Sequence, residues 1–555
     1  SAPQRSRVIF DKLRCHSSMA TDSSSSGGGG RAIVWFRGTD LRVHDNGVLS
    51  KAVVSLQRNE SMDIVPLFCY DPRWFAPSRY GSPCKTGPHR AQFLIDSVND
   101  LRKSLRALGS DLVVDVGPPE ECIPKLVPPG ASCTVFTQRE VTSEEIAAER
   151  AVSKALPARS RLDLVWGSTL YHLDDLEFDV YKKMPTVFTP FRQKVESGST
   201  VRPTLPRLKV GDLGSMPADI DVDGGRGGHI KRVDDLPTSV VPSPMKAPAT
   251  DPRSAFTMVG GETIALERLK YYLFDSNIVS NYFNIRNGML GGDYSTKLAP
   301  ALAHGCISPR LIHSEISRYE REHGANKSTY WVIFELIWRD YFKFYAVAQG
   351  SAIFLEGGPS GKHKVWEKDP GGEKFRRWKE GQTGWPLVDA NMRELAATGF
   401  MSNRGRQNVA SFLCLDLNLD WRLGADYFEH MLLDYDVASN WGNWVAAAGL
   451  TGGRVNKFNI VKQSKDYDKD GDYIRTWLPE LANVPSEKIH EMKLSIKDRQ
   501  AFGVDDSYPS APMKSVFKYA SSEDKTATTR FGNKGGFKAK GKSRPHRRPS
   551  LADWE

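Results

Sequence analysis

The chain has 555 residues, 40% of them hydrophobic and 10% aromatic, and a formal net charge of +10. That length exceeds one ordinary hydrophobic core, so we expect two domains with terminal extensions. No apolar run approaches the roughly 18 residues of a membrane-spanning helix, which excludes a helical membrane protein. The seven cysteines are scattered and include no CxxC pair. They favour free thiols in a reducing, intracellular compartment over disulfides or a structural metal site.

The positive charge lies mainly at the two ends of the chain. Residues 526–550 carry eight Lys and Arg and no acid, and residues 1–31 carry five basic and two acidic residues. Because these ends supply +8 and +3 of the +10, the remainder carries about −1. The folded body is therefore close to neutral, and a nucleic-acid contact there needs a local basic patch.

Short β-rich runs alternate with helical patterns from Ala32 to about Gly167. The runs cover residues 32–36, 64–70, 112–116, 134–137 and 162–166, and the helical patterns lie near 46–57, 90–108, 119–127 and 143–156. This alternation predicts an α/β domain at 31–170 with a doubly wound, parallel five-stranded sheet. The GxGxxG fingerprint of dinucleotide-binding sheets is absent after the first run, where WFRGTDLRVHDN stands.

The remaining segments differ in composition. Residues 171–254 are predicted to be a linker, rich in Pro, Gly and Asp in its later part, and residues 255–485 an all-helical domain with many tryptophans. Residues 486–555 have the composition of a disordered Gly/Lys/Arg-rich tail. Residues 1–30 end in SSSSGGGG and are predicted to be a disordered leader, with part of an organelle transit peptide as the alternative.

Polar residues are concentrated between Gly399 and Trp444, in an otherwise apolar helical setting. Buried polar groups are costly unless they have partners, so this segment predicts a large polar ligand. Three runs resemble the flavin-binding core of the photolyase/cryptochrome family, and most closely its DASH-type cryptochromes: TYWVIFELIWRDYF (329–342), FMSNRGRQ (400–407) and LLDYDVASNWGNW (432–444). The resemblance covers about residues 32–485 and implies an α/β antenna domain followed by a helical FAD-binding domain.

The resemblance also implies which residues bind the FAD. Arg406 would stabilise an anionic ring, Asp434 and Asp436 would accept hydrogen bonds, and Asn440 would stand opposite flavin N5. On spacing alone the two aspartates could indicate a metal site or an acid/base dyad, but no suitable third ligand lies near. The run DYSTKLAP resembles the pyrophosphate loop, with Ala299 where a Ser is usual. The other implied cofactor residues are Tyr282, Ser295, Thr296, Lys297, Leu298 and Arg339.

A substrate pocket is implied by the same motifs. Glu335, Trp338 and Arg339 share one helical face, which on spacing alone is more typical of a core helix with one ion pair than of a binding site. In the family, the glutamate and tryptophan line a cavity for a flipped pyrimidine dimer. Ala446 stands where repair enzymes carry an aromatic residue, so this pocket is expected to be wider. The implied catalytic residues are Glu335, Trp338, Asn403 and Asn440, and the implied DNA contacts are Trp338, Arg404 and Gln407.

Two further features concern light and electrons. Trp444, Trp421 and Trp366 resemble the family's electron-transfer chain, although the chain has 13 tryptophans and many of them serve packing alone. Glu149 corresponds to the carboxylate that contacts a folate antenna, 5,10-methenyltetrahydrofolate. An exposed helical glutamate is the alternative.

We therefore predict FAD-dependent, blue-light-driven repair of cyclobutane pyrimidine dimers, a lyase reaction, by a monomer acting preferentially on single-stranded or looped DNA. The alternatives are a blue-light photoreceptor with vestigial repair, and a nucleic-acid-binding regulator. For the second, Phe531 and Phe537 of the basic tail could stack on RNA or single-stranded DNA. A chloroplast or mitochondrion, the nucleus and the cytoplasm all remain open as locations.

Overall fold

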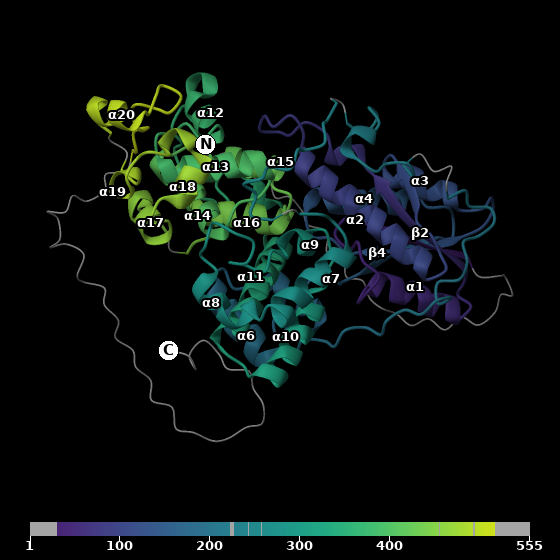
Figure 1. Cartoon of the computed structure of the whole chain (residues 1–555). Helices are drawn as coiled ribbons and strands as arrows, with labels where there is room; N and C mark the ends of the chain where they lie inside the picture. The colour runs from purple at the N-terminus through teal and green to yellow at the C-terminus, as the bar shows by residue number, and fades with distance from the viewer. Residues whose placement is uncertain are drawn as a thin grey trace, which may run out of the picture.

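The computed structural model of the chain describes residues 30–222, 227–241, 244–256, 258–453, 455–491 and 494–516. These residues form an α/β part and a helical part that lie side by side (Figure 1). The predicted leader, except for its last residue, and the basic tail with its eight cations lie outside the described residues. None of the described helices has both the length and the apolarity needed to cross a membrane.

Five parallel strands form the sheet of the α/β part, as predicted. They are β1 Gly30–Phe36, β2 Ser61–Tyr70, β3 Val113–Val116, β4 Cys133–Gln138 and β5 Arg161–Val165. The strand order is β3-β2-β1-β4-β5, with Ile33 of β1 paired to Val65 of β2 and to Val135 of β4. The order reverses at β1, which is the arrangement of a doubly wound sheet with a crevice at the carboxyl ends of its strands.

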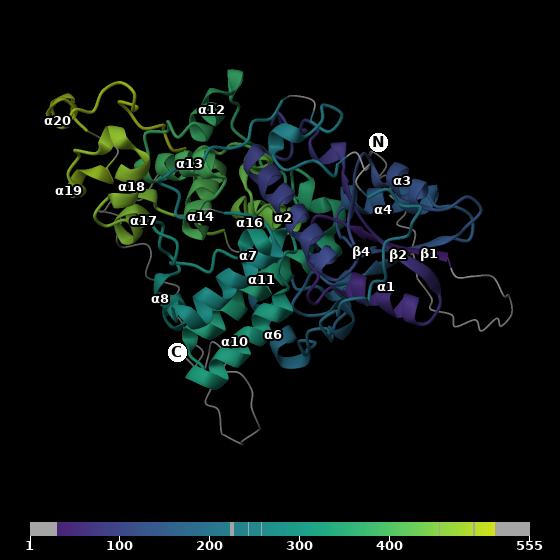
Figure 2. The same ribbon diagram turned by 45° about the vertical axis from the view of Figure 1, so that its right-hand side comes forward.

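Helices cover both faces of this sheet (Figure 2). They are α1 Gly47–Gln57, α2 Pro88–Ala107, α3 Pro119–Cys122 and α4 Ser143–Ala155. Successive residues of β1 enter different cores: Val34 and Phe36 belong to the large core, whereas Ile33 and Trp35 pack with α3 and α4. This alternation follows from the two-residue period of a strand, and burial on both faces explains why the strand sequence AIVWF is continuously apolar.

The helical part begins within the segment predicted as a linker. That segment contains α5 Val180–Lys183 and α6 Phe188–Gly198, and α6 packs against the central helix α11. Phe188 stacks on Trp338 with ring centroids 3.6 Å apart, and Phe191 is fully buried. The prediction of a linker over 171–254 is therefore corrected: a long irregular connection begins only after α6, and its described residues contain one short 3-10 turn at Val233–Asp235.

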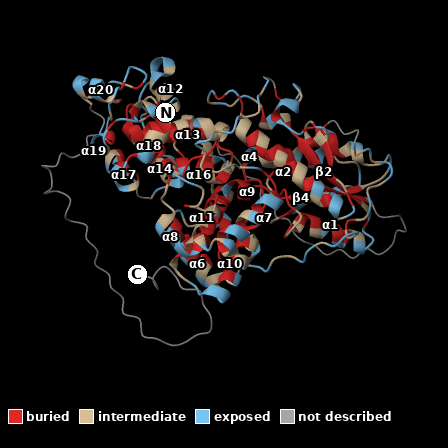
Figure 3. Cartoon of the chain, in the orientation of Figure 1, coloured by how far each residue is buried: buried red, intermediate tan, exposed pale blue. Residues whose placement is uncertain are grey.

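The described residues after 258 contain helices and no strand, as predicted. The helices are α7 Glu262–Lys270, α8 Tyr282–Ile285, α9 Ala299–Ala303, α10 Pro309–His323, α11 Lys327–Gln349, α12 Glu373–Lys379, α13 Pro386–Thr398, α14 Asn403–Ser411, α15 Trp421–Met431, α16 Val437–Ala447, α17 Ile460–Tyr467, α18 Asp472–Trp477, α19 Ser486–Ile489 and α20 Ile496–Phe502. α11 runs through the buried centre of the molecule (Figure 3).

Both ends of α11 are set by local chemistry. The Asn326 side chain accepts hydrogen bonds from the backbone of Ser328 and Thr329, and the helix ends at Gly350, whose φ of 53° suits glycine. α16 crosses α11 closely at Gly442, where a Cβ would lie 2.4 Å from Cδ1 of Phe342. A side chain at Gly442 would push these two helices apart.

The carboxyl edge of the sheet docks on α11. Lys343 Nζ lies 2.6 Å from Glu140 Oε2, and both side chains are almost fully buried. Three residues earlier, the buried Asp340 accepts hydrogen bonds from the backbone N–H groups of Leu170 and Tyr171. These contacts join the two parts through charged groups that lie out of reach of water.

The described residues of the segment 486–516, which are 486–491 and 494–516, are folded, and this corrects the prediction that the tail begins at Ser486. Four hydrophobic side chains in this segment are buried: Ile489, Val504, Tyr508 and Met513. Tyr508 donates a hydrogen bond to Asp389 of α13, and Trp385 Nε1 donates to the Met513 carbonyl. The low apolar content of this segment concealed these anchors, because each apolar residue packs singly and no helical or strand period links them.

A chain truncated after Pro485 should be clearly less stable than one truncated after Ala520. Burying one large apolar side chain stabilises a fold by about 1.5–3 kcal/mol, so losing four should lower the melting temperature of the helical part by roughly ten degrees or more. Calorimetry of the two truncated proteins and the full chain measures this. Equal melting temperatures for all three would show that the segment only rests on the surface.

Lys343→Met should lower the free energy of unfolding by about 3–5 kcal/mol, because it leaves the Glu140 carboxylate buried without its partner. Burial alone would lower the pKa of Lys343, but Glu140 and Asp436 hold it above its ordinary value. Burial would likewise raise the pKa of Glu140, but Lys343 and Arg37 hold it below its ordinary value.

These two pKa shifts fix the pH dependence of the pair's contribution. The contribution of Lys343 to the free energy of unfolding is complete at neutral pH and is lost as the pH rises through the folded-state pKa of Lys343. The contribution of Glu140 is lost as the pH falls through the folded-state pKa of Glu140. Denaturant titrations of the parent and Lys343→Met across pH should converge at both extremes. Arg318→Ala breaks an exposed pair with Glu315 and should cost at most about 1 kcal/mol.

Candidate functional site

The inner face of α11 carries the predicted substrate residues. Glu335 and Trp338 are both half-buried, and Glu335 Oε1 accepts a hydrogen bond of 3.1 Å from Trp331 Nε1. Arg286 Nη1 lies 3.6 Å from the same oxygen. Burial raises the pKa of Glu335, while Arg286 and the Trp331 hydrogen bond oppose the rise. The carboxyl group is thus held in a fixed position in a setting that favours its protonated form.

Trp338 already has a ring partner. Phe188 of α6 stacks on it with an interplanar angle of 5°, and Phe342 lies 5.7 Å away, also nearly parallel. A base that stacks on Trp338 must therefore use ring surface that Phe188 leaves uncovered. Ala446 on α16 is half-buried, and it supplies no aromatic ring.

α14 presents residues to two sides. Asn403 and Gln407 are exposed, and Arg404 between them donates hydrogen bonds of 2.9 Å to Gln407 and to Asn287. On the inner side, Arg406 Nε donates to the Met401 carbonyl and its Nη2 to Asp434 Oδ2, at 2.9 and 2.8 Å. The predicted DNA contacts thus face outward, and the predicted cofactor arginine faces inward.

Asp434, Asp436 and Asn440 lie at or just before the start of α16, and Asp434 keeps one oxygen free. Asp434 Oδ1 is buried and has no hydrogen-bond partner. Asp436 caps the helix by accepting from Ser439 N, and Asn440 donates to the Ala425 carbonyl. Burial would raise the pKa of Asp436, but Lys343 and Arg339 hold it below its ordinary value. Arg339 itself donates to the carbonyls of Ser168 and Leu302.

The loop 293–298 holds a second group of buried polar atoms. Lys297 has a φ of 58°, and its Nζ is buried without a hydrogen-bond partner, 3.2 Å from the Tyr294 ring centroid. Burial lowers the pKa of Lys297 to about 6. The Tyr294 hydroxyl is also buried and unpartnered. Ser295 and Thr296 are half-buried, Leu298 is buried, and Ala299 opens the short helix α9.

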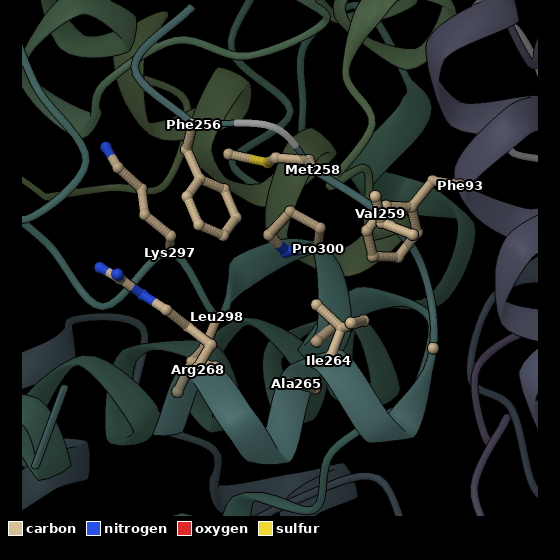
Figure 4. Close-up of a pocket in the computed structure, with 12 residues that line it drawn as sticks. Phe93, Phe256, Met258, Val259, Ile264, Ala265, Arg268, Lys297, Leu298 and Pro300 are labelled. Carbon is tan, nitrogen blue, oxygen red and sulfur yellow. The ribbon is translucent and has the colours of Figure 1, made fainter. Parts of the chain in front are cut away.

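Arg268 of α7 holds this loop from behind. It donates to the carbonyls of Gly292, Ser295 and Thr296 and to the Asp293 carboxylate. Figure 4 shows Arg268 and Lys297 at one end of an outer cleft that is otherwise lined by apolar side chains, including Phe256 and Met258. The Lys297 ammonium group points away from that apolar lining (Figure 4).

The buried atoms without partners show what the interior can hold. Asp434 Oδ1, Lys297 Nζ and the Tyr294 hydroxyl would each cost free energy if they stayed unpaired. Arg406 supplies positive charge, Lys297 supplies a buried amine whose protonated form an anionic ligand would stabilise, and Asp434 supplies an acceptor. Acceptors, donors and cations in one interior suit a large ligand with anionic and hydrogen-bonding groups, such as a dinucleotide. Burial raises the pKa of Tyr282, at the start of α8, and the nearby Glu335 carboxylate adds to the rise.

The three tryptophans of the predicted electron-transfer chain make no ring contacts with one another in the part of the chain that the structure describes. Trp444 contacts Trp378 at 6.2 Å, and its ring fits against Gly424, one turn of α15 from Trp421. Trp421 instead contacts Trp441 at 5.7 Å. Trp366 is half-buried, with Lys364 Nζ 4.1 Å from its ring centroid.

Glu149 is buried on α4, so the alternative of an exposed helical residue is wrong. Its Oε1 accepts hydrogen bonds from Arg37 Nη1 and from the backbone of Glu140. Its Oε2 makes no hydrogen bond with any described residue. Burial raises the pKa of Glu149, which Arg37 and the Glu140 backbone oppose.

Sequence reasoning missed several residues that shape this region: Lys343, Glu140, Arg268, Trp441 and Glu429. Lys343 could have been noticed as a lone cation in the apolar run YFKFY, one turn after Arg339. The others carry no local signal, because their partners lie far away in the sequence.

Two protein-family models match the chain. The model described as DNA photolyase matches residues 32–209, and the model described as the FAD binding domain of DNA photolyase matches residues 331–527. The second match extends well beyond Pro485, in agreement with the folded segment that follows it.

Curated relatives are similar over most of the chain. A chloroplastic/mitochondrial cryptochrome DASH of Ostreococcus tauri is 51% identical, and the aligned region covers 83% of this chain and 86% of that one. Cryptochrome DASH of Xenopus laevis is 48% identical over 83% and 85% of the two chains. Among solved structures, a Synechocystis cryptochrome matches with a TM-score of 0.79 and 42% identity, covering 88% of this chain and 97% of that one.

Asp434→Ala and Arg406→Ala should each weaken FAD binding at least about tenfold, because each leaves a buried charged partner uncompensated. Fluorescence titration of the flavin-free protein with FAD measures the affinity. Asp466→Ala breaks only the exposed pair with Lys462 and serves as the control. Parental affinity in both site variants would show that the cofactor does not contact this pair.

Proposed function

Because the chain belongs to the DASH-type cryptochromes of the photolyase/cryptochrome family, we propose that it is a blue-light-driven lyase that splits cyclobutane pyrimidine dimers in DNA. The observation that carries the proposal is the arrangement on α11. One helix presents Glu335 and Trp338 toward the substrate side and Arg339 and Lys343 toward the carboxylate of Asp436. A substrate bound at the first pair would lie one or two helical turns from the cofactor groups.

FAD fits the residues of the helical part, and when it is bound and reduced it supplies the electron that opens the dimer and takes it back afterward. Arg406, Asp434, Asp436, Asn440 and the loop residues Ser295 to Leu298 would hold it. The unpartnered atoms of Asp434 and Lys297 support this role. One N–H of the Asn440 amide is engaged by the Ala425 carbonyl, so its second N–H and its oxygen would be left to hydrogen-bond the flavin ring.

The substrate side must receive two adjacent, covalently joined bases that have been flipped out of one DNA strand. Trp338 would stack on one base, and Glu335 would hydrogen-bond the dimer or give it a proton. The raised pKa of Glu335 supports the second role, because a carboxyl group must hold a proton before it can donate one, and burial favours the protonated form. Asn403, Arg404 and Gln407 lie on the outward side of α14, where they could position the strand by its backbone.

Single-stranded or looped DNA is the proposed preferred substrate. Extruding a base costs least where it is unpaired, and the folded body carries little net charge with which to attract a duplex. The basic tail, which lies outside the described residues, would add affinity for DNA or RNA that does not depend on sequence.

A folate antenna, 5,10-methenyltetrahydrofolate, is proposed at the carboxyl edge of the sheet. Glu149 Oε2 is the atom that supports it, because Oε1 already accepts two hydrogen bonds and Oε2 accepts none from the described residues. The Arg37 contact would keep the carboxylate in place while a ligand bound it.

A blue-light photoreceptor is the second candidate, and two observations favour it. Phe188 covers one face of Trp338, and Ala446 leaves one wall of the pocket without an aromatic ring. Both features would lower the affinity for a pyrimidine dimer without affecting cofactor binding.

The proposed compartment is reducing. The six cysteines among the described residues are all buried and unpaired. The relative from Ostreococcus tauri is named chloroplastic/mitochondrial, which supports an organelle as one location and leaves the nucleus and cytoplasm as the others.

Glu335→Ala and Trp338→Ala should each lower dimer repair at least about tenfold without releasing FAD, because these side chains face the substrate. The measurement is repair of a dimer-containing oligonucleotide, single- or double-stranded, by the pre-reduced protein in blue light. Arg318→Ala on α10 is the control and should repair like the parent. A parent that binds FAD and never repairs single-stranded dimers would contradict the repair proposal and favour the photoreceptor.

A further inference from the structure

Trp441 is better placed than Trp366 to donate an electron to oxidised Trp421. The Trp441 ring lies 5.7 Å from the Trp421 ring, centroid to centroid, in an edge-to-face arrangement. Trp421 is fully buried and Trp441 nearly so. Trp366 makes no ring contact with Trp421 anywhere in the described residues.

The indole N–H of Trp441 has acceptors. Trp441 Nε1 lies 3.2 Å from Glu429 Oε2 and 3.3 Å from the Tyr435 hydroxyl. A tryptophan that loses an electron becomes a much stronger acid, and a carboxylate at hydrogen-bond distance can take its proton at once. Loss of the proton converts the tryptophan radical cation into a neutral radical. A neutral radical costs far less free energy in a buried site than a cation does.

The environment of Trp366 is the opposite. Its Nε1 is buried and has no hydrogen-bond partner, so its proton has no acceptor. Lys364 Nζ lies 4.1 Å from the ring centroid and donates to the Cys414 carbonyl, which holds it there. A cation at that distance opposes a second positive charge on the ring.

We propose that Trp441 is an electron-transfer residue and that Glu429 is its proton acceptor. The two residues form a branch of the electron-transfer chain that starts at Trp421, and the long-lived radical is located on Trp441. Trp441 gives one electron to oxidised Trp421, and its N–H proton passes to the Glu429 carboxylate. The products are restored Trp421, a neutral Trp441 radical and protonated Glu429. An external thiol returns the electron, and Glu429 returns the proton.

The inference rests on the proposed function, because the light-excited flavin is the primary oxidant that it requires. Trp444 would connect that oxidant to Trp421 through its contact with α15. Photoreduction of the bound flavin in the parent protein therefore tests the proposed function, and the identity of the surviving radical tests the inference.

The groups around Glu429 set the pH range in which the branch operates. Burial raises the pKa of Glu429 to about 7, and Arg90, the Tyr435 hydroxyl, Lys85 and the Trp441 N–H oppose that rise. Arg90 also stacks on the Tyr435 ring at 4.5 Å. Glu145 of α4, which faces Tyr435, adds negative charge to the same cluster.

The protonation state of Glu429 determines whether the yield of neutral radical rises or falls with pH. Only the carboxylate can accept the proton, so the neutral radical should form fully above the pKa of Glu429. Below that pKa, which is about 7, the carboxylate fraction falls by about tenfold for each pH unit. Glu429→Gln should show the low-pH behaviour at every pH.

The experiment is light-minus-dark electron paramagnetic resonance and transient absorption of the FAD-loaded protein, which distinguish neutral from cationic tryptophan radicals. Trp441→Phe should abolish the long-lived neutral radical, and Trp366→Phe should leave it unchanged. Trp477→Phe is the matched control, since Trp477 is buried and contacts no other aromatic ring within the described residues, only the Arg253 guanidinium 4.4 Å from its ring centroid. A neutral radical that survives in Trp441→Phe and disappears in Trp366→Phe would overturn the inference.

A second readout needs no flavin. In the flavin-free protein, the fluorescence difference between the parent and Trp441→Phe should titrate with a midpoint near the Glu429 pKa, about 7. Glu429→Gln should remove that titration. If the difference is constant between about pH 5 and about pH 9, the carboxylate does not contact Trp441 in solution and the inference fails. A parent that neither binds FAD nor photoreduces would overturn the proposed function together with the inference.

Discussion

The buried contact between Lys343 and Glu140 is the constraint on which the rest of the structure depends. A charged pair without water is stable only when its geometry is fixed and its remaining bonding capacity is met. Thr39 and Gln138 donate to the same carboxylate, and Asp436 adds negative charge near Lys343. The sheet edge, the central helix and the start of α16 are thereby held in one arrangement. Moving any of them would leave a charge in an apolar interior.

The cofactor region depends on the same arrangement. α11 offers one side to the sheet and the other to α16, and the close crossing at Gly442 leaves no room for sliding. Asp436 takes part in both regions, as the cap of α16 and as a neighbour of Lys343. The site residues are therefore positioned by contacts between the two parts of the chain as well as by their own helices.

Local patterns in the sequence were enough to predict the strands and helices whose apolar residues recur at a regular spacing. The five apolar runs, each bounded by turns, predicted five strands, and the three-to-four-residue spacing placed Glu335 with Trp338 on one helical face. Motif resemblance assigned Arg406 and Asp434 to one cofactor site, and the hydrogen bond between them comes from the structure. The folded segment after Pro485 could not be predicted, because Tyr508 and Met513 are anchored singly to distant residues. The same holds for Trp441 and Glu429, whose relation comes from two helices meeting in space.

The position of α6 has a consequence for how the chain is made. Phe188 stacks on Trp338 and Phe191 is fully buried, yet α6 precedes α11 by more than a hundred residues of chain, most of them irregular or belonging to other helices. During synthesis the sheet can close early, since its strands are all complete by Val165. The aromatic face of α6 then waits, exposed to solvent, until the ribosome has released α11. Over that interval the nascent chain presents an apolar patch that invites chaperone binding or aggregation, so the speed of translation between these two helices bears directly on the yield of folded protein.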